Sequence, residues 1–382
     1  MTNTEYTLDD FIKVAKRENN AKRSYLYVNP LQGKHVPVSP IASISVFTCL
    51  AKMLEQRYPQ ERLLIIGFAE TATAIGSHIA YEATNADYYM NTTREDVLGT
   101  DYLFFTESHS HATEQRLVKK KLEVVLDKID RIVFAEDEVT TGNTIEKLVN
   151  AIKSEYRGVS CKFSIISILN SMSDERVDEL QHGGISCEFL HRIPFEYHIS
   201  DVNKYKYEKL RSDIPKGNII KPIWINIGNS WNCRVVQDTV IMREKLNAFV
   251  KEAIEQLSID PQADSLLVMG TEEFMFPGML LGKNLEQQLN IPIVRFHATT
   301  RSPIEISLDQ SYPLHNRTPL ESLYERERKT FIYNLQHYDG VIIVTDSNQK
   351  NLNGLHSLLS ALEEYGNKNV VVVNWGDANV EE

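Results

Sequence analysis

Short apolar runs alternate with stretches of helical periodicity along this chain. The apolar runs have strand length and lie at 62–68, 101–107, 131–137, 162–170 and 186–191. Helical patterns lie at 71–83, at 145–152 with apolar residues spaced i, i+3, i+4 and i+7, and at about 240–257. Because strands that alternate with helices usually pair in parallel, the pattern predicts an α/β fold with mostly parallel sheets.

Residues 200–235 interrupt the alternation with a polar, aromatic and turn-rich segment. We interpret this segment as the connection between two domains, 1–225 and 226–382, as the length of 382 residues also suggests.

Three segments of the second half echo three segments of the first half. In chain order, the pairs are 265–285 with 62–82, 298–303 with 91–96, and 339–362 with 130–152. We interpret the echo as an internal duplication, in which two doubly wound domains share a fold and the second is a degenerate copy. Chance similarity of generic strand–turn–helix units is the alternative.

The composition narrows the classes of function. A net charge of −11 disfavours a broad nucleic-acid surface but leaves room for a local phosphate pocket. The cysteines lack Cys-x-x-Cys spacing, which indicates free thiols in a reducing cytosol: Cys49, Cys161, Cys187 and Cys233. No signal peptide is evident, and no apolar run approaches the ~20 residues of a membrane span. We expect a soluble, cytoplasmic protein without nucleic-acid or membrane partners.

The turn that follows the strand at 131–137 carries the clearest chemistry. It comprises Thr140, Thr141, Gly142, Asn143 and Thr144. Ligands bind where strands of such sheets end and helices begin, and helix N-termini favour anions. The hydroxyls and the glycine therefore predict a cradle for a phosphate monoester, although the turn lacks the lysine of a Walker loop.

Two carboxylates precede this turn, separated from it by Glu138 and Val139. Glu136 and Asp137 are suited to accept hydrogen bonds from vicinal hydroxyls or to hold Mg²⁺ through water. A ribose 5-phosphate satisfies both the turn and the acids. The alternative is a helix-capping cluster, since Thr, Asn, Asp and Glu are ordinary residues at helix starts.

The string FAEDEVTTGNT, residues 134–144, resembles the phosphoribosyl diphosphate (PRPP) motif of type I, orotate-like phosphoribosyltransferases. The resemblance implies that Glu136, Asp137 and Val139–Thr144 bind PRPP. Mg²⁺ would be held mainly through PRPP, with Glu136 and Asp137 contacting it via water. The string departs from the family at Glu136, which is more often Asp, and at Glu138, which is usually apolar.

The same resemblance assigns further regions. The diphosphate loop corresponds to Phe68, Ala69, Glu70, Thr71, Ala72 and Thr73. Arg94 matches a cationic residue that contacts diphosphate, with a solvated arginine as the alternative. Residues 105–115 correspond to a flexible catalytic loop, whose candidates are Glu107, His109 and His111. Either 29–40, with Lys34 and His35, or 190–225 would form a hood over the base.

The string TRSP at Thr300–Pro303 extends the likeness to the second half. The chain resembles the phosphoribosyltransferase–TRSP proteins of bacterial tellurite-resistance and stress gene clusters. That resemblance implies biosynthesis of a nucleoside-like metabolite, with a second copy of the chain or other proteins of the cluster as partners.

The second half keeps an aspartate, Asp346, at the position that matches Asp137, but it has Gln-Lys-Asn-Leu-Asn in place of the hydroxyl-rich turn. We therefore do not expect it to bind a ribose phosphate in the same way. Its candidate site comprises Glu272, Glu273, Thr300, Arg301, Ser302 and Asp346. A ligand-binding or regulatory site and a packing scaffold both remain open, and Arg301 alternatively pairs with Glu305 at i+4.

The expected function is transfer of the phosphoribosyl group from PRPP to a nitrogen of a base-like small molecule, with Mg²⁺ and release of diphosphate. The alternatives are a non-catalytic sensor of PRPP or nucleotides and a scaffold of a biosynthetic complex.

Overall fold

The contacts in the computed structural model divide the chain into two compact units. The residues described are 6–18, 24–105, 115–193, 199–217, 220–347 and 352–376. Within them, the first unit draws on Ser45–Tyr197 and Asn232–Glu244, and the second on Glu5–Ile44, His198–Trp231 and Lys245–Glu382. The boundaries fall inside two helices, α2 (Pro40–Arg57) and α7 (Thr239–Gln256). The domain boundary expected after residue 225 stays a prediction.

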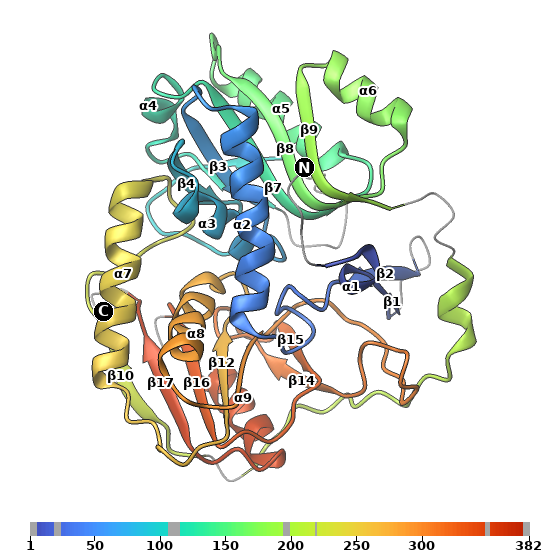
Figure 1. Ribbon diagram of the computed structural model, residues 1–382, viewed down its shortest axis with the longest axis vertical. Coiled ribbons are helices and arrows are strands. Elements are labelled where there is room, and N and C mark those ends of the chain that lie inside the picture. Colours follow the sequence, from blue (N-terminus) through green and yellow to red (C-terminus); the bar gives the residue numbers. More distant parts are fainter. Residues whose placement is uncertain are drawn as a thin grey trace. The chain divides into compact units, whose positions relative to one another are not determined.

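A six-stranded sheet with the order β11-β4-β3-β7-β8-β9 forms the centre of the first unit. Its strands are β3 (Leu63–Gly67), β4 (Ala86–Asn91), β7 (Arg131–Val139), β8 (Lys162–Asn170), β9 (Ile185–Arg192) and β11 (Gln237–Asp238). Neighbouring strands are parallel, except that β11 runs antiparallel to β4. The helices of this unit are α3 (Thr73–Glu82), α4 (Leu122–Leu126), α5 (Asn143–Glu155) and α6 (Asp174–His182), together with most of α2 (Figure 1).

Close packing of α3 on β3 fixes the loop between them. A Cβ atom added to Gly76 would lie 2.7 Å from the Cα of Gly67, so the helix and the strand meet through two glycines. Helix α5 buries the four residues that its spacing predicts: Ile145, Leu148, Val149 and Ile152. Full burial of one such aliphatic side chain stabilises a fold by about 1.5–3 kcal/mol.

The apolar run at 101–107 forms a strand, but this strand does not join the parallel sheet. It is β5 (Tyr102–Phe104), which pairs antiparallel with β6 (Arg116–Val118). The parallel sheet has no place for it beside β3, because β4 and β7 occupy the two edges of that strand. The hairpin is therefore an insertion between β4 and β7.

The second unit is built around five parallel strands in the order β10-β17-β16-β12-β13. They are β10 (Ile223–Asn226), β12 (Ser265–Gly270), β13 (Ile293–Ala298), β16 (Gly340–Thr345) and β17 (Val370–Asn374). The unit also contains α8 (Phe276–Gln288), α9 (Leu352–Glu364), most of α7, and the hairpin of β14 (Arg317–Glu321) and β15 (Lys329–Tyr333). Strand β10 comes from the polar segment that the sequence presented as a connection, so that segment completes the sheet edge.

The N-terminal residues add a small layer to the second unit. It contains α1 (Leu8–Phe11) and the hairpin of β1 (Lys13–Lys16) and β2 (Tyr25–Val28), and the short 3-10 helix η1 (Ile199–Lys204) also belongs to this unit. Ala15, Leu26 and Val28 of the hairpin share a buried apolar cluster with Ile304 and Tyr333. Residues that are far apart in the sequence therefore build one core.

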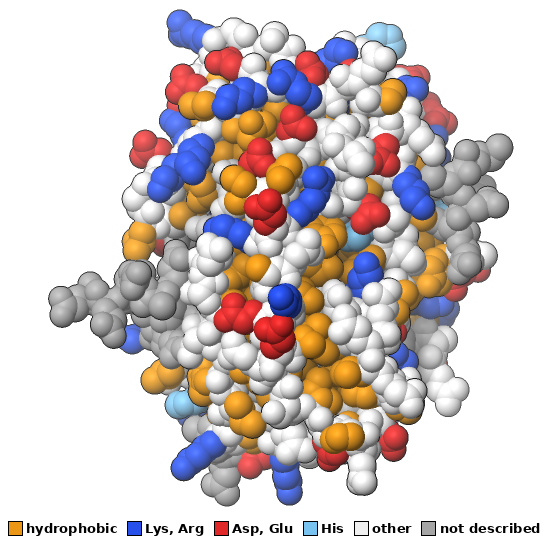
Figure 2. All heavy atoms as spheres, turned by 60° about the vertical axis from the view of Figure 1, so that its left-hand side comes forward, with side chains coloured by type: hydrophobic (Ala, Val, Ile, Leu, Met, Phe, Trp, Pro, Cys, Tyr) orange, Lys and Arg blue, Asp and Glu red, His pale blue; other side chains and the backbone are white. Residues whose placement is uncertain are grey.

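These observations confirm the predicted fold class, an α/β chain with mostly parallel sheets. Among the residues described, no helix has the length and apolar character needed to cross a bilayer. Figure 2 shows one face, on which Lys and Arg side chains are interspersed with Asp and Glu side chains.

Candidate functional site

The carboxyl end of β7 brings together the two regions that the sequence assigns to one ligand. Glu136, Asp137 and Glu138 are half-buried there, and Ala135 just before them pairs with Gly67 at the end of β3. The Thr71 hydroxyl donates to Asp137 Oδ1 over 3.0 Å. Loop 68–73 and the acidic pair therefore meet at the carboxyl ends of adjacent central strands, where ligands of open α/β sheets bind.

The electrostatics of this strand end favour a positive or hydroxyl-bearing ligand. Burial raises the pKa of Glu136 well above its usual value, and the neighbouring carboxylates of Asp137 and Glu138 raise it further. The guanidinium of Arg94 opposes these effects and lowers the pKa of Glu136. Arg94 is half-buried and close enough to act on this strand end electrostatically.

Glu138, where the resemblance leads one to expect an apolar residue, has a polar neighbour in the structure. The Ser171 hydroxyl donates to Glu138 Oε1 over 2.9 Å, and Ser171 directly follows β8. The departure from the family pattern at Glu138 is therefore matched by a hydroxyl on the next strand end.

The hydroxyl-rich turn presents its side chains to solvent. Thr141, Asn143 and Thr144 are exposed, Thr140 is half-buried, and α5 begins at Asn143 rather than at Ile145, the first apolar residue of its pattern. The first N–H groups of a helix have no acceptor within the helix, so the start of α5 offers donors beside these hydroxyls.

Gly142 gives this turn its shape. Its φ of +68° lies in the left-handed region, which glycine adopts without the cost that other residues incur. A Cβ atom there would also lie 2.8 Å from Leu180 Cδ1 of α6. Both backbone geometry and packing therefore require glycine at this position.

Sequence reasoning missed the residue that holds the turn in place, Arg176 on α6. Its Nε donates to the Thr141 carbonyl oxygen over 2.8 Å, and its Nη2 donates to Asn143 Oδ1 over 3.1 Å. Nη2 also bonds to Glu146 on the first turn of α5 over 2.8 Å. The arginine stands more than 30 residues from the turn, and no local pattern marks it.

Loop 68–73 is mostly buried, with Thr71 half-exposed. The Ala69 N–H donates to Thr92 Oγ1 over 2.8 Å, and the Ala69 carbonyl accepts from Gln115 Nε2 over 3.0 Å. The Ala69–Glu70 peptide bond is cis. The loop backbone is therefore held from two sides, by the residue after β4 and by the residue before β6.

The remaining predicted residues of the first unit, Glu107, His109 and His111, lie outside the residues described. The flanking strands β5 and β6 are described, so the hairpin that bears these residues is defined up to Phe105 and from Gln115 onward.

The donors at the end of β7 fit a magnesium ion that arrives with its ligand. Carboxylate oxygens are the donors that Mg²⁺ prefers, and it commonly keeps several waters and is shared with substrate phosphates. The described residues contain no group of three or more His, Cys, Asp or Glu side chains placed to hold a metal. Glu136 and Asp137 supply carboxylate oxygens at this strand end.

The candidate residues of the second unit gather mainly around Glu272. Arg301 Nε donates to Glu272 Oε2 over 2.9 Å, and Arg301 Nη2 lies 3.8 Å from Glu273 Oε1. The alternative partner, Glu305, instead has a pKa that burial raises and that Lys16 and Arg317 lower. Arg301 therefore reaches back to the loop after β12.

The other predicted residues of this unit form hydrogen bonds with residues of the β14–β15 hairpin and of the loop within it. Thr300 exchanges backbone hydrogen bonds with Phe331, and the Ser302 carbonyl accepts from the Tyr333 hydroxyl over 2.6 Å. At the end of β16, Asp346 accepts from the Tyr324 hydroxyl over 2.6 Å. Tyr324, in the loop between β14 and β15, carried no signal in the sequence.

Lys34, expected in a hood over a base, has a structural contact in the second unit. Its side chain is fully buried, and its Nζ donates to the carbonyl oxygens of Glu272 and Thr299 over 2.9 Å each. Within the second unit, the N-terminal segment thus holds the loop after β12 and the residue after β13.

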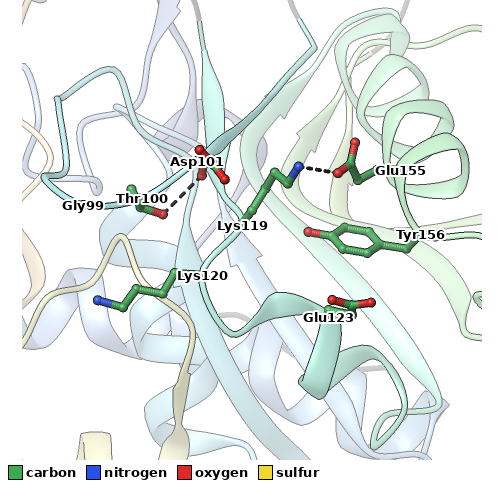
Figure 3. A pocket seen from close by; sticks show the side chains of 8 residues that line it. All are labelled: Gly99, Thr100, Asp101, Lys119, Lys120, Glu123, Glu155 and Tyr156. Carbon is green, nitrogen blue, oxygen red and sulfur yellow. Dashed lines mark hydrogen bonds and ion pairs between the residues drawn. The ribbon is translucent and has the colours of Figure 1, made fainter.

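A separate pocket of about 730 Å³ lies at the base of the β5–β6 hairpin. Figure 3 shows Lys119 directed at Glu155, with which it forms an ion pair, and the Tyr156 ring beside them. Burial raises the pKa of Tyr156 to about 12. None of the predicted site residues lines this pocket, whose walls are Gly99, Thr100, Asp101, Lys119, Lys120, Glu123, Glu155 and Tyr156.

Two known families match separate parts of the chain. Residues 11–193 match the family described as phosphoribosyl transferase. Residues 239–362 match the family described as the TRSP domain, C-terminal to that phosphoribosyl transferase. A comparison with curated proteins finds no match.

Solved structures of phosphoribosyltransferases are similar to part of the chain. Adenine phosphoribosyltransferase from Thermoanaerobacter pseudethanolicus is 15% identical, with a TM-score of 0.36, over 49% of this chain and 98% of its own. Orotate phosphoribosyltransferase from Aeropyrum pernix is 13% identical, with a TM-score of 0.31, over 50% and 90%. Adenine phosphoribosyltransferase from Saccharomyces cerevisiae is 9% identical, with a TM-score of 0.32, over 48% and 96%.

Proposed function

Because this chain carries a phosphoribosyl transferase domain followed by a TRSP domain, we propose that its first unit transfers the phosphoribosyl group of PRPP to a nitrogen of a base-like acceptor. The carbon–oxygen bond to diphosphate breaks with its electron pair on the leaving diphosphate, and the acceptor nitrogen bonds to the same carbon. The observation that carries the proposal is the hydrogen bond from Thr71 to Asp137, because it joins the loop proposed for diphosphate to the acids proposed for ribose.

The roles follow from the chemistry of each group. The turn of Thr140–Thr144 and the start of α5 bind the 5-phosphate, and Glu136 and Asp137 accept hydrogen bonds from the ribose hydroxyls. Loop 68–73 and Arg94 face the diphosphate. Such a transfer builds positive charge on ribose and negative charge on the leaving group, so positioning and fixed charges contribute most of the catalysis.

Mg²⁺ bound with PRPP would supply charge neutralisation on the diphosphate. Glu136 and Asp137 would hold it through water, in keeping with their carboxylate oxygens and partial exposure. In the catalytic loop proposed from the resemblance, His109 and His111 remain candidates to donate to the leaving diphosphate, and Glu107 remains a candidate with either a catalytic or a structural role.

We also propose that the reaction belongs to the cytoplasmic biosynthesis of a nucleoside-like metabolite, which is what the resemblance of the sequence to the phosphoribosyltransferase–TRSP proteins of tellurite-resistance and stress gene clusters implies. A second copy of the chain or other enzymes of that synthesis are the proposed protein partners.

The test is release of diphosphate from PRPP in the presence of Mg²⁺ and a panel of purine and pyrimidine bases. Asp137→Asn should abolish turnover and leave the thermal midpoint within a few degrees of the natural chain. Asp178→Asn, an exposed change in the same unit, is the matched control.

The test has four informative outcomes. Turnover that depends on Asp137 supports the enzyme. Tight PRPP binding without turnover of any base points instead to a sensor, and no PRPP binding at millimolar concentration points to a scaffold. Unchanged PRPP affinity in Asp137→Asn would contradict the site.

A further inference from the structure

The loop after β3 in the first unit is held by a set of hydrogen bonds to the residues after β4. The Thr92 N–H donates to the Gly67 carbonyl over 2.9 Å, and Thr92 Oγ1 accepts from the Ala69 N–H over 2.8 Å. Thr93 then exchanges two backbone hydrogen bonds with Arg116 of the inserted hairpin. These bonds define three positions. They are Gly67 at the end of the strand, Ala69 in the loop two residues later, and Thr93 where it meets the hairpin.

The second unit repeats this set bond for bond. The Thr299 N–H donates to the Gly270 carbonyl over 3.3 Å, and Thr299 Oγ1 accepts from the Glu272 N–H over 3.0 Å. Thr300 exchanges two backbone hydrogen bonds with Phe331 of the β14–β15 hairpin. By this correspondence, Glu272 stands where the first unit has Ala69, and Arg301 stands where it has Arg94.

The Glu272 carboxylate is bound as a ligand anion would be. Arg301 Nε and Arg328 Nη2 donate to its Oε2 over 2.9 and 3.0 Å, and the Ser322 hydroxyl donates to its Oε1 over 2.6 Å. Its side chain is 0% exposed, whereas those of Arg301 and Arg328 are 9% and 10% exposed. Two guanidinium groups and a hydroxyl around one carboxylate form a strong anion site, especially away from water.

The backbone keeps this carboxylate in position. Glu272 has a φ of +48°, in the left-handed region that costs energy for a residue with a Cβ atom. Its N–H is held by Thr299 and its carbonyl by the buried amino group of Lys34. The loop is thus fixed at the residue that delivers the carboxylate.

We propose that Arg301, Arg328 and Ser322 form an anion-binding site of the second unit, which the chain fills with its own Glu272. Because Glu272 occupies this site, the second unit does not bind diphosphate. The first unit has Ala69 at the corresponding position, and this residue brings no negative charge that would compete with a diphosphate. The comparison with the first unit rests on the proposed function, because that function assigns the diphosphate to loop 68–73 and Arg94. The anion site itself rests only on the contacts around Glu272.

The test removes the built-in anion and supplies a free one. Glu272→Ala in the full chain should lower the thermal midpoint in chloride. Acetate should restore it by about 3 °C or more at equal ionic strength, because an anion that binds only the folded state stabilises it. Inorganic diphosphate should act at lower concentration than acetate, since it brings more charge.

Two variants serve as controls. The double variant Glu272→Ala, Arg301→Ala removes part of the site itself and should gain less from acetate than Glu272→Ala. Glu272→Gln keeps the shape of the side chain and should be insensitive to anions. If Glu272→Ala stays unfolded in chloride, the recovery of folded chain after dilution from urea into acetate or into chloride is measured instead. Equal recovery in the two salts, or equal acetate dependence of the natural chain and Glu272→Ala, would overturn the anion site.

Calorimetry with inorganic diphosphate and with PRPP separates the two proposals. The natural chain should bind one PRPP, and Glu272→Ala should bind one additional diphosphate. Two PRPP per natural chain would contradict self-occupation of the second site. Absence of PRPP binding would contradict the proposed function, while acetate rescue of Glu272→Ala would still support the anion site.

Discussion

Arg176 Nε donates a hydrogen bond to the Thr141 carbonyl oxygen over 2.8 Å. This bond connects the hydroxyl-rich turn after β7 to helix α6, which follows β8. The same guanidinium reaches Asn143 and Glu146. The conformation of the turn that we propose for the 5-phosphate therefore depends on Arg176 of α6 as well as on the residues of the turn itself.

Arg176→Ala should raise the KM for PRPP about tenfold, equivalent to ~1.4 kcal/mol, with a smaller change in kcat. The reason is that hydrogen bonds from a charged donor contribute about 1.5–3 kcal/mol each, and here they order a turn that meets the ligand. Steady-state kinetics check this prediction. Arg57→Ala, which removes an exposed pair with Glu188, is the control and should leave the KM unchanged. Equal KM values in the two variants would argue against a positioning role for Arg176.

Thr71→Val should weaken PRPP binding about fivefold, because it removes a hydrogen bond worth ~1 kcal/mol that orients Asp137. Calorimetry measures the affinity directly. Thr84→Val is a close match, since Thr84 also donates its hydroxyl to a carboxylate, that of Glu55. An affinity loss as large in Thr84→Val would show that the effect is not specific to the site.

Gly142→Ala should destabilise the fold by about 1–2 kcal/mol from backbone strain and by more from the approach of its Cβ to Leu180. Urea unfolding gives the change in the free energy of unfolding. Gly99→Ala separates the two causes, because Gly99 has the same φ of +68° and nothing within 4 Å of the added Cβ. If both variants lose the same free energy, the contact with Leu180 contributes nothing.

The raised pKa of Glu136 predicts a stability that depends on pH. In the folded chain this carboxyl keeps its proton to a higher pH than in the unfolded chain, where its pKa is near 4.5. Between the two pKa values the folded state binds more protons, so the free energy of unfolding falls as pH rises through that window.

Glu136→Gln removes the charge and should therefore raise the thermal midpoint at neutral pH, with the gain vanishing below about pH 4.5. Thermal melts between pH 4 and 8 measure the difference. Asp178→Asn, an exposed change on α6, provides the baseline. A variant less stable than the natural chain at pH 8 would contradict the sign of the shift.

Lys34→Met should destabilise the second unit by about 2–4 kcal/mol, because two buried carbonyl oxygens, of Glu272 and Thr299, lose a charged donor. Urea unfolding checks the loss, and Lys216→Met, an exposed change in the same unit, is the control. A loss below 0.5 kcal/mol, at about the scale of ordinary surface changes, would mean that water replaces the lysine without cost.

The parts of this structure that the sequence predicts are those set by local periodicity and turn chemistry. The helix with Ile145, Leu148, Val149 and Ile152 forms as its spacing requires. Strand β7, which carries the two acidic residues, is parallel to its neighbours β3 and β8. These features depend on neighbouring residues and on one buried face, which a pattern of apolar positions encodes directly.

The features that escaped prediction depend on contacts between residues distant in the chain. Arg176 acts on a turn 35 residues earlier, and Lys34 acts on Glu272, 238 residues later. Strand β10 lies in a segment without strand-like alternation, because an edge strand with one parallel partner, β17, needs few apolar residues. A single sequence gives no local trace of such contacts.

The N-terminal segment has a consequence for synthesis. Residues Glu5–Ile44 are made before Ser45–Tyr197 and Asn232–Glu244 of the first unit, yet they complete a unit whose last strand, β17, is made more than 300 residues later. A chain that starts at residue 239, where the TRSP match begins, lacks Lys34 and the β1–β2 hairpin. The second unit therefore cannot finish folding before β17 has been made, and a gene cut between the two family matches would deliver neither half whole.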